Sequence, residues 1–342
     1  IHELVYPVTA NFERLQKRAQ NHRVDYAGAE MFTKVYRDGS TCPVLIGDGV
    51  VSNARSNKIT GEAKYHEQYF DLLLTAMLKR LHPQGHDNIW LALAYPSDAI
   101  DYLDDIKAVV GGLHKITTLS GDTLKFNVKR LIFFEEASGG MLRFLERNEK
   151  QKSQVQVEDG QRIIVCDIGG KISSMTMVGI GDKLEPVVLY QESPDPFNLG
   201  IIDVLENFAR ELKGLHPNEF KSFKTAGSIP MNMLQEGIRT GKLLLSGKFF
   251  DVPQARMNAI ANIADEIQSR YENNMQGGKN AAHIVISGGG GGLLAPLLRM
   301  EVLQHESIHL ADDIKTIERA NLRGGSVAMI EWLSERGFIE NE

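Results

Sequence analysis

The sequence predicts an α/β protein with two halves, each built from helices packed on a mixed β-sheet. Strand patterns alternate with amphipathic helix patterns in both halves, as is typical of helix-covered sheets. A polar, charged segment punctuated by glycine, residues 147–161, separates the halves and is typical of a surface connection. With 342 residues, the chain is long enough for two domains with cores of their own.

Composition narrows the class of protein. The 38 Lys and Arg residues against 44 Asp and Glu residues give a net charge of −6, which argues against a general nucleic-acid or anionic-membrane surface. No apolar stretch is long enough to span a bilayer, and the N-terminal residues lack a signal peptide's basic and apolar regions. Cys42 and Cys166 lie far apart and form no metal spacing, as in a reducing compartment. We expect a cytoplasmic protein that has no membrane span and does not bind nucleic acid directly.

The first half is expected to contain two hairpins with tight glycine turns. Asp38-Gly39 and Gly121-Asp122 are turn dipeptides flanked by alternating apolar residues. Between and after the hairpins, apolar periodicity predicts helices and buried strands. In chain order the elements are strands 31–37 and 42–46, helix 65–81, strand 88–94, strands 114–119 and 123–128, an apolar run 130–134 and helix 137–145.

The second half opens with three strand patterns joined by glycine-rich turns, which predict an antiparallel meander. A helix follows at 201–212, because apolar residues recur there at helical spacing. A mostly helical stretch, a strand and two further helices complete the pattern. The strands are 162–167, 172–180, 184–190 and 283–286; the helical stretch is 220–271, and the last helices are 293–300 and 326–335.

The most informative feature is Ser287 followed by five glycines, Gly288 to Gly292, between a strand and a helix. Consecutive glycines let the backbone approach a ligand closely. The helix start that follows directs free N–H groups and a positive dipole end toward that ligand. A nucleotide fits these properties best. A flexible connector is the alternative, but connectors seldom end so abruptly in apolar elements on both sides.

Two carboxylate positions could carry chemistry. Asp167 ends an apolar strand just before Gly169-Gly170, where it could hold a hydrated Mg²⁺ ion or simply cap a hairpin turn. Glu135 and Glu136 end another apolar run just before a helix, where a carboxylate could orient a water or merely complement the helix dipole. The sequence has no P-loop, no G-x-S-x-G elbow and no H-E-x-x-H motif.

Several motifs occur in a shared order: Asp167-Ile168-Gly169-Gly170, Gly200, residues 284–294 (IVISGGGGGLL) and residues 320–325 (ANLRGG). Together they resemble the bacterial and archaeal actin-like ATPases of the plasmid-segregating ParM/StbA type. Looser matches extend through the first half, at residues 5–8, 44–48, 91–96 and 134–140. The resemblance implies an actin-like, ribonuclease H-like fold with two lobes, in which duplicated mixed β-sheet domains surround a nucleotide cleft.

The resemblance also implies domains and site residues. Residues 1–150 would form the first lobe and 151–325 the second, with a helical insert at about 215–280. The helix within 326–342 would pack back on the first lobe. Glu136 would be the catalytic carboxylate, and Asp167 would bind Mg²⁺ through water. The nucleotide-binding residues would be Asp167, Gly169, Gly170, Lys171, Glu236, Arg239, Lys242, Gly288, Gly289, Gly290 and Leu293.

Two departures from the family pattern bear on hydrolysis. The first phosphate loop, D-x-G-x-x-x-x-K, does not occur, and we expect it in a hairpin of roughly twenty residues that precedes Ile1. After Gly170 the family prefers T-T-D, whereas this chain has Lys171 and ends the segment with Ser174. An added cation and a missing carboxylate near the γ-phosphate would weaken hydrolysis.

The resemblance implies an ATPase, weak if these two departures slow hydrolysis, that would polymerise with ATP or GTP, bind ATP or ADP with Mg²⁺, and assemble with itself head-to-tail. Its implied role is plasmid segregation or intracellular organisation, with a DNA-binding adaptor as partner. A nucleotide-binding regulator without activity and a small-molecule kinase of the same superfamily are the alternatives. Glu135 occupies a position where relatives carry proline, so its removal is expected to have little effect.

Overall fold

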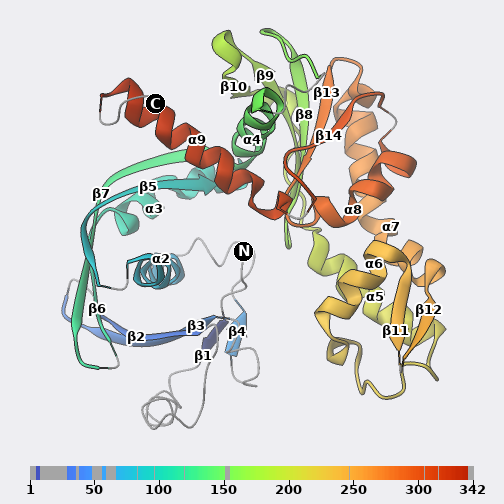
Figure 1. Cartoon of the computed structure of the whole chain (residues 1–342), viewed down its shortest axis with the longest axis horizontal. Helices are drawn as coiled ribbons and strands as arrows, with labels where there is room; N and C mark the ends of the chain where they lie inside the picture. Colours follow the sequence, from blue (N-terminus) through green and yellow to red (C-terminus); the bar gives the residue numbers. More distant parts are fainter. Residues whose placement is uncertain are drawn as a thin grey trace. The chain divides into compact units, whose positions relative to one another are not determined.

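The computed structural model describes residues 5–7, 29–35, 38–47, 56–58, 67–82, 84–95, 97–118, 120–150, 155–245, 247–303, 305–314 and 316–337. The chain forms two compact units, one of residues 1–93 and 99–133, the other of residues 94–98 and 134–342 (Figure 1). The units divide before helix α4 (Glu136–Lys150), whereas the lobes predicted from the resemblance divide at residue 150; those lobes stay a prediction. No helix in the described ranges has both the length and the apolar character that a membrane span requires.

The second unit is organised around a mixed five-stranded sheet, in the order β10-β9-β8-β13-β14. Strands β8 (Arg162–Ile168), β9 (Ser173–Ile180) and β10 (Pro186–Val188) form the predicted antiparallel meander, which is confirmed. Strand β10 is shorter than predicted, because 3₁₀ turns occupy Asp182–Leu184 and Tyr190–Glu192. Strands β13 (His283–Ser287) and β14 (Ile308–Leu310) add to β8 in parallel.

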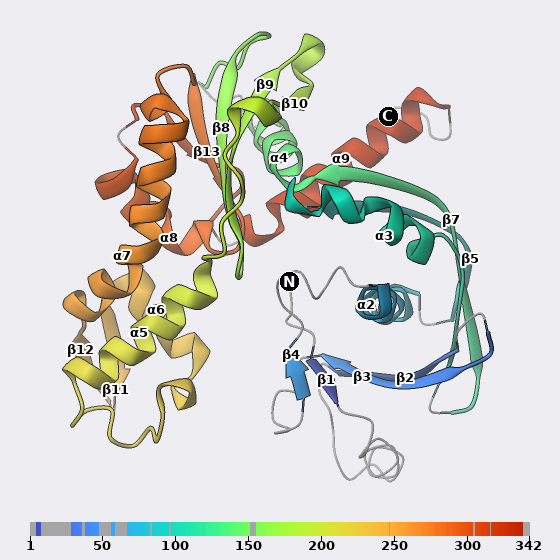
Figure 2. The same ribbon diagram turned by 180° about the vertical axis from the view of Figure 1, so that it is seen from behind.

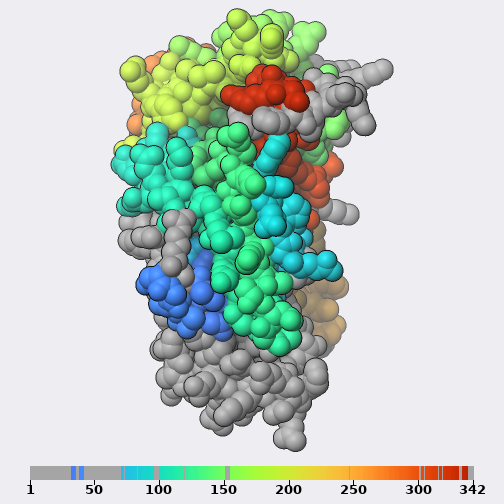
Figure 3. Space-filling view, turned by 90° about the vertical axis from the view of Figure 1, so that its left-hand side faces the viewer, coloured from blue at the N-terminus to red at the C-terminus, as the bar shows by residue number. Residues whose placement is uncertain are grey.

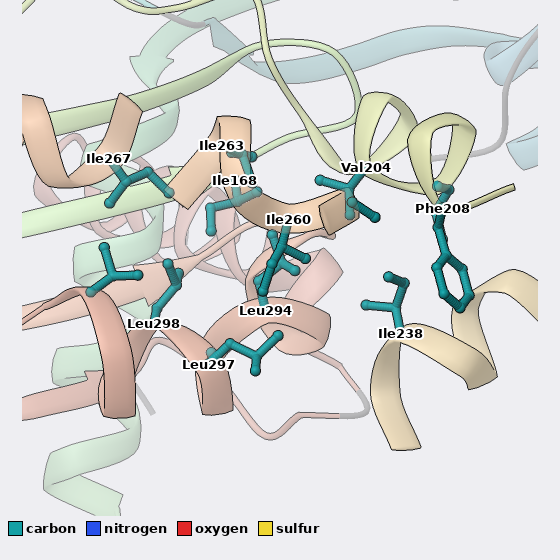
Figure 4. Packing of buried hydrophobic residues seen from close by; sticks show 14 of the residues in the cluster. Ile168, Val204, Phe208, Ile238, Ile260, Ile263, Ile267, Leu294, Leu297 and Leu298 are labelled. Atoms are coloured by element: carbon teal, nitrogen blue, oxygen red, sulfur yellow. The ribbon is translucent and has the colours of Figure 1, made fainter. Parts of the chain in front are cut away.

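The central strand β8 is buried on both faces, which explains its continuous apolar sequence. Ile164, Cys166 and Ile168 pack on one face against helices α5 (Ile201–Leu215), α7 (Pro253–Ser269) and α8 (Gly291–Leu297). Figure 4 shows Ile168 among side chains from these three helices. Ile163 and Val165 pack on the other face against α4. Helices α5, α7 and α8 therefore cover one face of the sheet, and α4 covers the other.

The stretch 220–271 is mostly helical, as predicted, but it also contains a β-hairpin that was not predicted. Helix α6 (Met231–Thr240) ends at Gly241, whose left-handed backbone (φ +71°) terminates the helix. Strands β11 (Lys242–Leu245) and β12 (Lys248–Asp251) then pair antiparallel. Leu243 is buried in the core of the unit. Four-residue strands are too short for alternation to distinguish them from helix.

Helix α9 (Ala320–Glu335) begins six residues before the predicted start and packs against α4. At the crossing of α4 and α9 the two backbones are in contact. A Cβ atom on Gly324 would overlap the carbonyl oxygen of Gly139. A Cβ atom on Gly325 would overlap the ring of Phe134. The glycine pair in the ANLRGG motif is therefore a packing requirement of this helix pair.

A buried ion network also joins α4 to α9. Asp312, fully buried after β14, accepts hydrogen bonds from Arg143 Nε at 3.0 Å and Arg323 Nη1 at 2.7 Å. Burial alone would raise the pKa of the Asp312 carboxyl, but the hydrogen bonds from Arg143 and from the Asp313 backbone outweigh it and hold the pKa at about 2. The ionised carboxylate thus links an arginine of each helix.

The remaining elements of the second unit are short. Helix α7 continues into a π-turn, Arg270–Asn274, and α8 into another, Leu298–Val302, where a helix was predicted for 293–300. Residues 151–154 of the predicted polar connection lie outside the described residues. Further 3₁₀ turns of the chain are Ser97–Tyr102, Ala226–Ser228, Gln276–Gly278 and Ile317–Arg319.

The first unit contains a five-stranded sheet in the order β3-β2-β6-β7-β5. Both predicted hairpins are confirmed: β2 with β3, and β6 with β7. The apolar run 130–134 is part of the long strand β7, whose side chains with those of β6 form much of the surface in Figure 3. The elements are β1 (Val5–Pro7), β2 (Ala29–Val35), β3 (Thr41–Gly47), β4 (Ser56–Lys58), α2 (Glu67–Leu81), β5 (His86–Tyr95), α3 (Leu103–Val110), β6 (Gly112–Thr117) and β7 (Thr123–Glu135).

A buried polar cluster connects the sheet of the first unit to α2. Lys34 of β2 is 3% exposed, and its ammonium donates to Asp71 Oδ1 at 2.9 Å and to Thr75 Oγ1 at 2.8 Å. His114 of β6 lies 3.1 Å from the same Asp71 oxygen. A charge this deeply buried is tolerated only because its partners replace water.

Removing the cation from this cluster should destabilise the protein. In the Lys34→Met variant, the free energy of unfolding should fall by about 3–5 kcal/mol, because Asp71 stays buried without its ammonium partner. Denaturant titration measures the change. Lys115→Met, at an exposed position of the neighbouring strand β6, should stay within about 0.5 kcal/mol of the wild type. Equal stability of the two variants would contradict a structural role for the buried pair.

Candidate functional site

The two glycine turns singled out in the sequence meet at one edge of the second unit's sheet. Strands β8 and β13 run parallel, with Asp167 directly beside Ser287, so the turns that follow them emerge together (Figure 2). Carboxyl ends of parallel strands are where open α/β sheets bind ligands. The predicted Asp167, Gly169, Gly170 and Gly288–Gly290 are thus brought together.

The carboxylate of Asp167 is held by two donors from distant parts of the chain. The side chain is buried, at 6% exposure, and its Oδ1 atom accepts a hydrogen bond from Ser287 Oγ at 2.7 Å. Asn321 Nδ2, in the first turn of α9, donates to the same oxygen at 3.3 Å. Sequence reasoning assigned no role to Ser287 or Asn321, although both stand inside motifs that it singled out. For Ser287, the sequence signal that could have suggested this role is a hydroxyl side chain at the end of a strand predicted to lie near the Asp167 strand.

Gly288 brings the turn after β13 into close approach with Ile168 and Asp167 at the end of β8. Its backbone is left-handed (φ +81°), and a Cβ atom would overlap the Ile168 carbonyl oxygen and lie 2.6 Å from Asp167 Oδ1. Gly290 N–H donates to that same Ile168 oxygen at 2.8 Å, which locks the two turns together. Gly289, between them, is exposed. The turn therefore has no room for side chains on its inner side and presents bare backbone outward.

The turn after β8 is packed against the start of helix α5. The carbonyl oxygens of Gly169 and Gly170 accept hydrogen bonds from the N–H groups of Ile201 and Ile202, at 3.0 and 2.9 Å. Lys171 Nζ donates to Asp203 Oδ1 at 2.7 Å. The cation that departs from the family pattern is therefore paired with a carboxylate of α5.

Helix α4 reaches the same cluster. A Cβ atom on its Gly140 would lie 3.1 Å from Ser287 Oγ and 3.0 Å from Asn321 Oδ1, a buried atom with no hydrogen-bond partner among the described residues. Glu136, the predicted catalytic residue, is the first residue of α4 and is half-buried. The helix that carries Glu136 is thus fixed beside the Asp167 cluster.

Three predicted contacts lie elsewhere in the second unit. Arg239 and Glu236 form an exposed ion pair on α6, 2.5 Å apart, and Lys242 lies 3.7 Å from Asp251 across the β11–β12 hairpin. Leu293, in the first turn of α8, packs against the core beneath the glycine turn. Nucleotide contacts by Glu236, Arg239 and Lys242 stay a prediction.

The site contains the buried carboxylate of Asp167 but no preformed set of metal-binding side chains among the described residues. Within the described parts of the chain, no group of three or more His, Cys, Asp or Glu side chains could hold a metal ion. A single strand-end carboxylate beside bare backbone turns fits a hydrated cation that is shared with an anionic ligand. The arrangement is suited to phosphate groups accompanied by Mg²⁺.

The fold of the chain is similar to that of several solved structures. The archaeal actin homolog Ta0583 matches with a TM-score of 0.65 at 16% identity, over 88% of this chain and 88% of that chain. A 15-stranded ParM filament from Clostridium botulinum gives 0.66 at 15% identity, over 95% and 91%. Bacillus thuringiensis ParM with ATP gives 0.63 at 13% identity, over 89% and 86%.

No protein-family model matches the sequence, and no curated protein does. At identities of 13–16%, the structural likeness establishes the fold alone. The chain has an actin-like α/β fold, so the fold class predicted from the motifs is confirmed.

The effect of the close approach at Gly288 on stability can be measured separately from the effect of its left-handed backbone. Gly160 has the same backbone (φ +82°) but open space around it, so Gly160→Ala should cost about 1–2 kcal/mol in the free energy of unfolding. Gly288→Ala carries the same strain and also displaces the Ile168 carbonyl or Asp167, so its cost should exceed the first by about 2 kcal/mol or more. Denaturant titration of both variants measures the difference. Equal costs would show that the turns do not interlock.

Proposed function

We propose that this protein binds a nucleoside triphosphate with Mg²⁺, assembles head-to-tail into a filament and hydrolyses the nucleotide. The observation that carries the proposal is Asp167 between two interlocked glycine turns at one sheet edge of an actin-like fold. Solved neighbours include a ParM filament, ParM with ATP and the archaeal actin homolog in complex with ADP. Segregation of plasmid DNA, through an adaptor that binds DNA, is the cellular role that we propose.

Asp167 is the residue that would hold the metal. Its Oδ1 atom is occupied by Ser287 and Asn321, so these donors fix the carboxylate against the strand end. When bound, Mg²⁺ would neutralise charge on the phosphate oxygens. The turns after Asp167 and Ser287 would supply backbone N–H groups to the phosphates, and Gly170 and Gly289 are the exposed residues of those turns.

Glu136 is the residue that we propose to act on water. It begins a helix whose next turns pack on the Asp167 cluster, and its half-buried carboxylate can accept a hydrogen bond from an attacking water. The Lys171–Asp203 pair removes one argument against hydrolysis, because the added cation is already neutralised.

A regulator that binds nucleotide without hydrolysing it is the second candidate. Ser174 is directly opposite Asp167 on strand β9, at the position where the family pattern has a carboxylate. Without that carboxylate, the neighbourhood of the γ-phosphate carries one fewer negative charge. Measurement of hydrolysis separates the two candidates.

Light scattering with ATP, GTP and a non-hydrolysable analogue tests the proposed function. We expect scattering to rise only with a triphosphate and Mg²⁺, and to decay as the hydrolysable nucleotide is consumed. ADP and a sample without nucleotide are the controls. Nucleotide binding without scattering would contradict filament assembly, and absence of binding would contradict the whole proposal.

The Glu136→Ala variant should hydrolyse nucleotide about 10²–10⁴-fold more slowly, because the residue that orients the water is lost. Nucleotide affinity should be nearly unchanged, and filaments should persist longer after ATP is added. Glu149→Ala, at an exposed position of the same helix, is the matched control and should behave as wild type. Equal rates for the two variants would contradict the assignment of Glu136.

A further inference from the structure

Strand β7 passes into helix α4 with no linker, so Phe134, Glu135 and Glu136 lie in succession at one junction. The ring of Phe134 packs against Gly325 of α9 and lies 3.0 Å from the Cβ position of Gly139. Neighbouring side chains on a strand point to opposite faces. Glu135 therefore faces away from this anchor and meets other residues.

Glu135 is a buried carboxylate held by a tyrosine. It is 5% exposed, and its Oε2 atom accepts a hydrogen bond from the Tyr190 hydroxyl at 2.8 Å. Its Oε1 atom is buried and has no hydrogen-bond partner among the described residues. Tyr190, in the turn after β10, also shares a side-chain hydrogen bond with Tyr95 at the end of β5. The junction is thus fastened on both faces.

Burial raises the pKa of Glu135, and the hydrogen bond from Tyr190 lowers it by less. Tyr190 is half-exposed; its partial burial raises the pKa of its hydroxyl, and its contacts with Glu135 and Tyr95 add to this. The neighbouring Glu136 is half-buried at the start of the helix, so the two adjacent carboxyl groups lie in different surroundings.

We propose that Glu135 is a positioning residue for Glu136, because its hydrogen bond with Tyr190 fixes the β7–α4 junction from which Glu136 projects. This inference rests on the proposed hydrolysis by Glu136. It also replaces the expectation from the sequence that removal of Glu135 has little effect. The Glu135 carboxylate is buried and hydrogen-bonded, so its removal differs from a substitution on the surface. The hydrogen bond, rather than the charge, is what positions the junction.

Steady-state hydrolysis by Tyr190→Phe, Glu135→Ala and Glu135→Gln tests the proposal. The first two variants each lack the hydrogen bond, and their kcat should fall about tenfold, while KM stays unchanged. Glu135→Gln keeps an oxygen that accepts the tyrosine hydrogen and should retain most of the wild-type kcat. The double variant Glu135→Ala/Tyr190→Phe should be no slower than either single variant, because one interaction is lost in each case.

Denaturant titration of the same variants is the second readout. The losses of stability in the two single variants should likewise be non-additive in the double variant. Glu192→Ala is the matched control: Glu192 lies in the same turn as Tyr190 but forms a partly exposed ion pair with Arg162. Its kcat should equal that of the wild type.

The outcomes distinguish this inference from the proposed function. A wild-type protein that does not hydrolyse nucleotide would overturn both. Hydrolysis by the wild type with an unchanged kcat in Tyr190→Phe would overturn the positioning role alone. The same holds if Glu135→Gln is as slow as Glu135→Ala, because the charge and not the hydrogen bond would then matter. A rise in KM with stable kcat would assign Glu135 to nucleotide binding.

Discussion

The second unit depends on keeping one carboxylate buried at the end of strand β8. Asp167 needs donors there, and it receives them from Ser287 on the neighbouring strand and Asn321 on α9. These donors bring together segments 120 and 154 residues apart in sequence. The backbone after β13 then lies so near Asp167 that only glycine fits at position 288. The carboxylate, the glycine turn and the start of α9 are therefore one structural element.

Bringing α9 to this carboxylate imposes a second constraint, on the α4–α9 pair. The helices approach until the backbones of Gly324 and Gly139 touch, and Asp312 holds both helices by Arg143 and Arg323. Because α4 begins with Glu136, the crossing of α4 with α9 places the helix that carries this residue beside the Asp167 cluster. The geometry of the candidate site follows from helix packing as much as from its own residues.

Two groups of buried charges among the described residues have charged partners. Lys34 faces Asp71 in the first unit, and Asp312 faces two arginines in the second. Glu135 and Asp167 instead accept hydrogen bonds from neutral groups, Glu135 from the Tyr190 hydroxyl and Asp167 from the side chains of Ser287 and Asn321, and burial raises the pKa of Glu135. A buried carboxyl group that lacks a cation costs stability, and such exceptions concentrate at functional positions. The location of Glu135 directly before Glu136 is the reason that we assign it a positioning role.

The sequence by itself determined the α/β class, the meander, both hairpins of the first unit and the two glycine turns, because periodicity and turn residues act over short distances. It also identified Asp167 and Glu136 as carboxylates at element ends. Only the tertiary structure decided that Ser287 and Asn321 hold Asp167, that Lys171 pairs with Asp203, and that Tyr190 holds Glu135. Each of these contacts joins side chains far apart in sequence, and local pattern carries no information about which distant donor a buried group meets. The β11–β12 hairpin was not predicted for a related reason. Its strands are short, and they are distinguished from a helix only by the packing of Leu243 in the core.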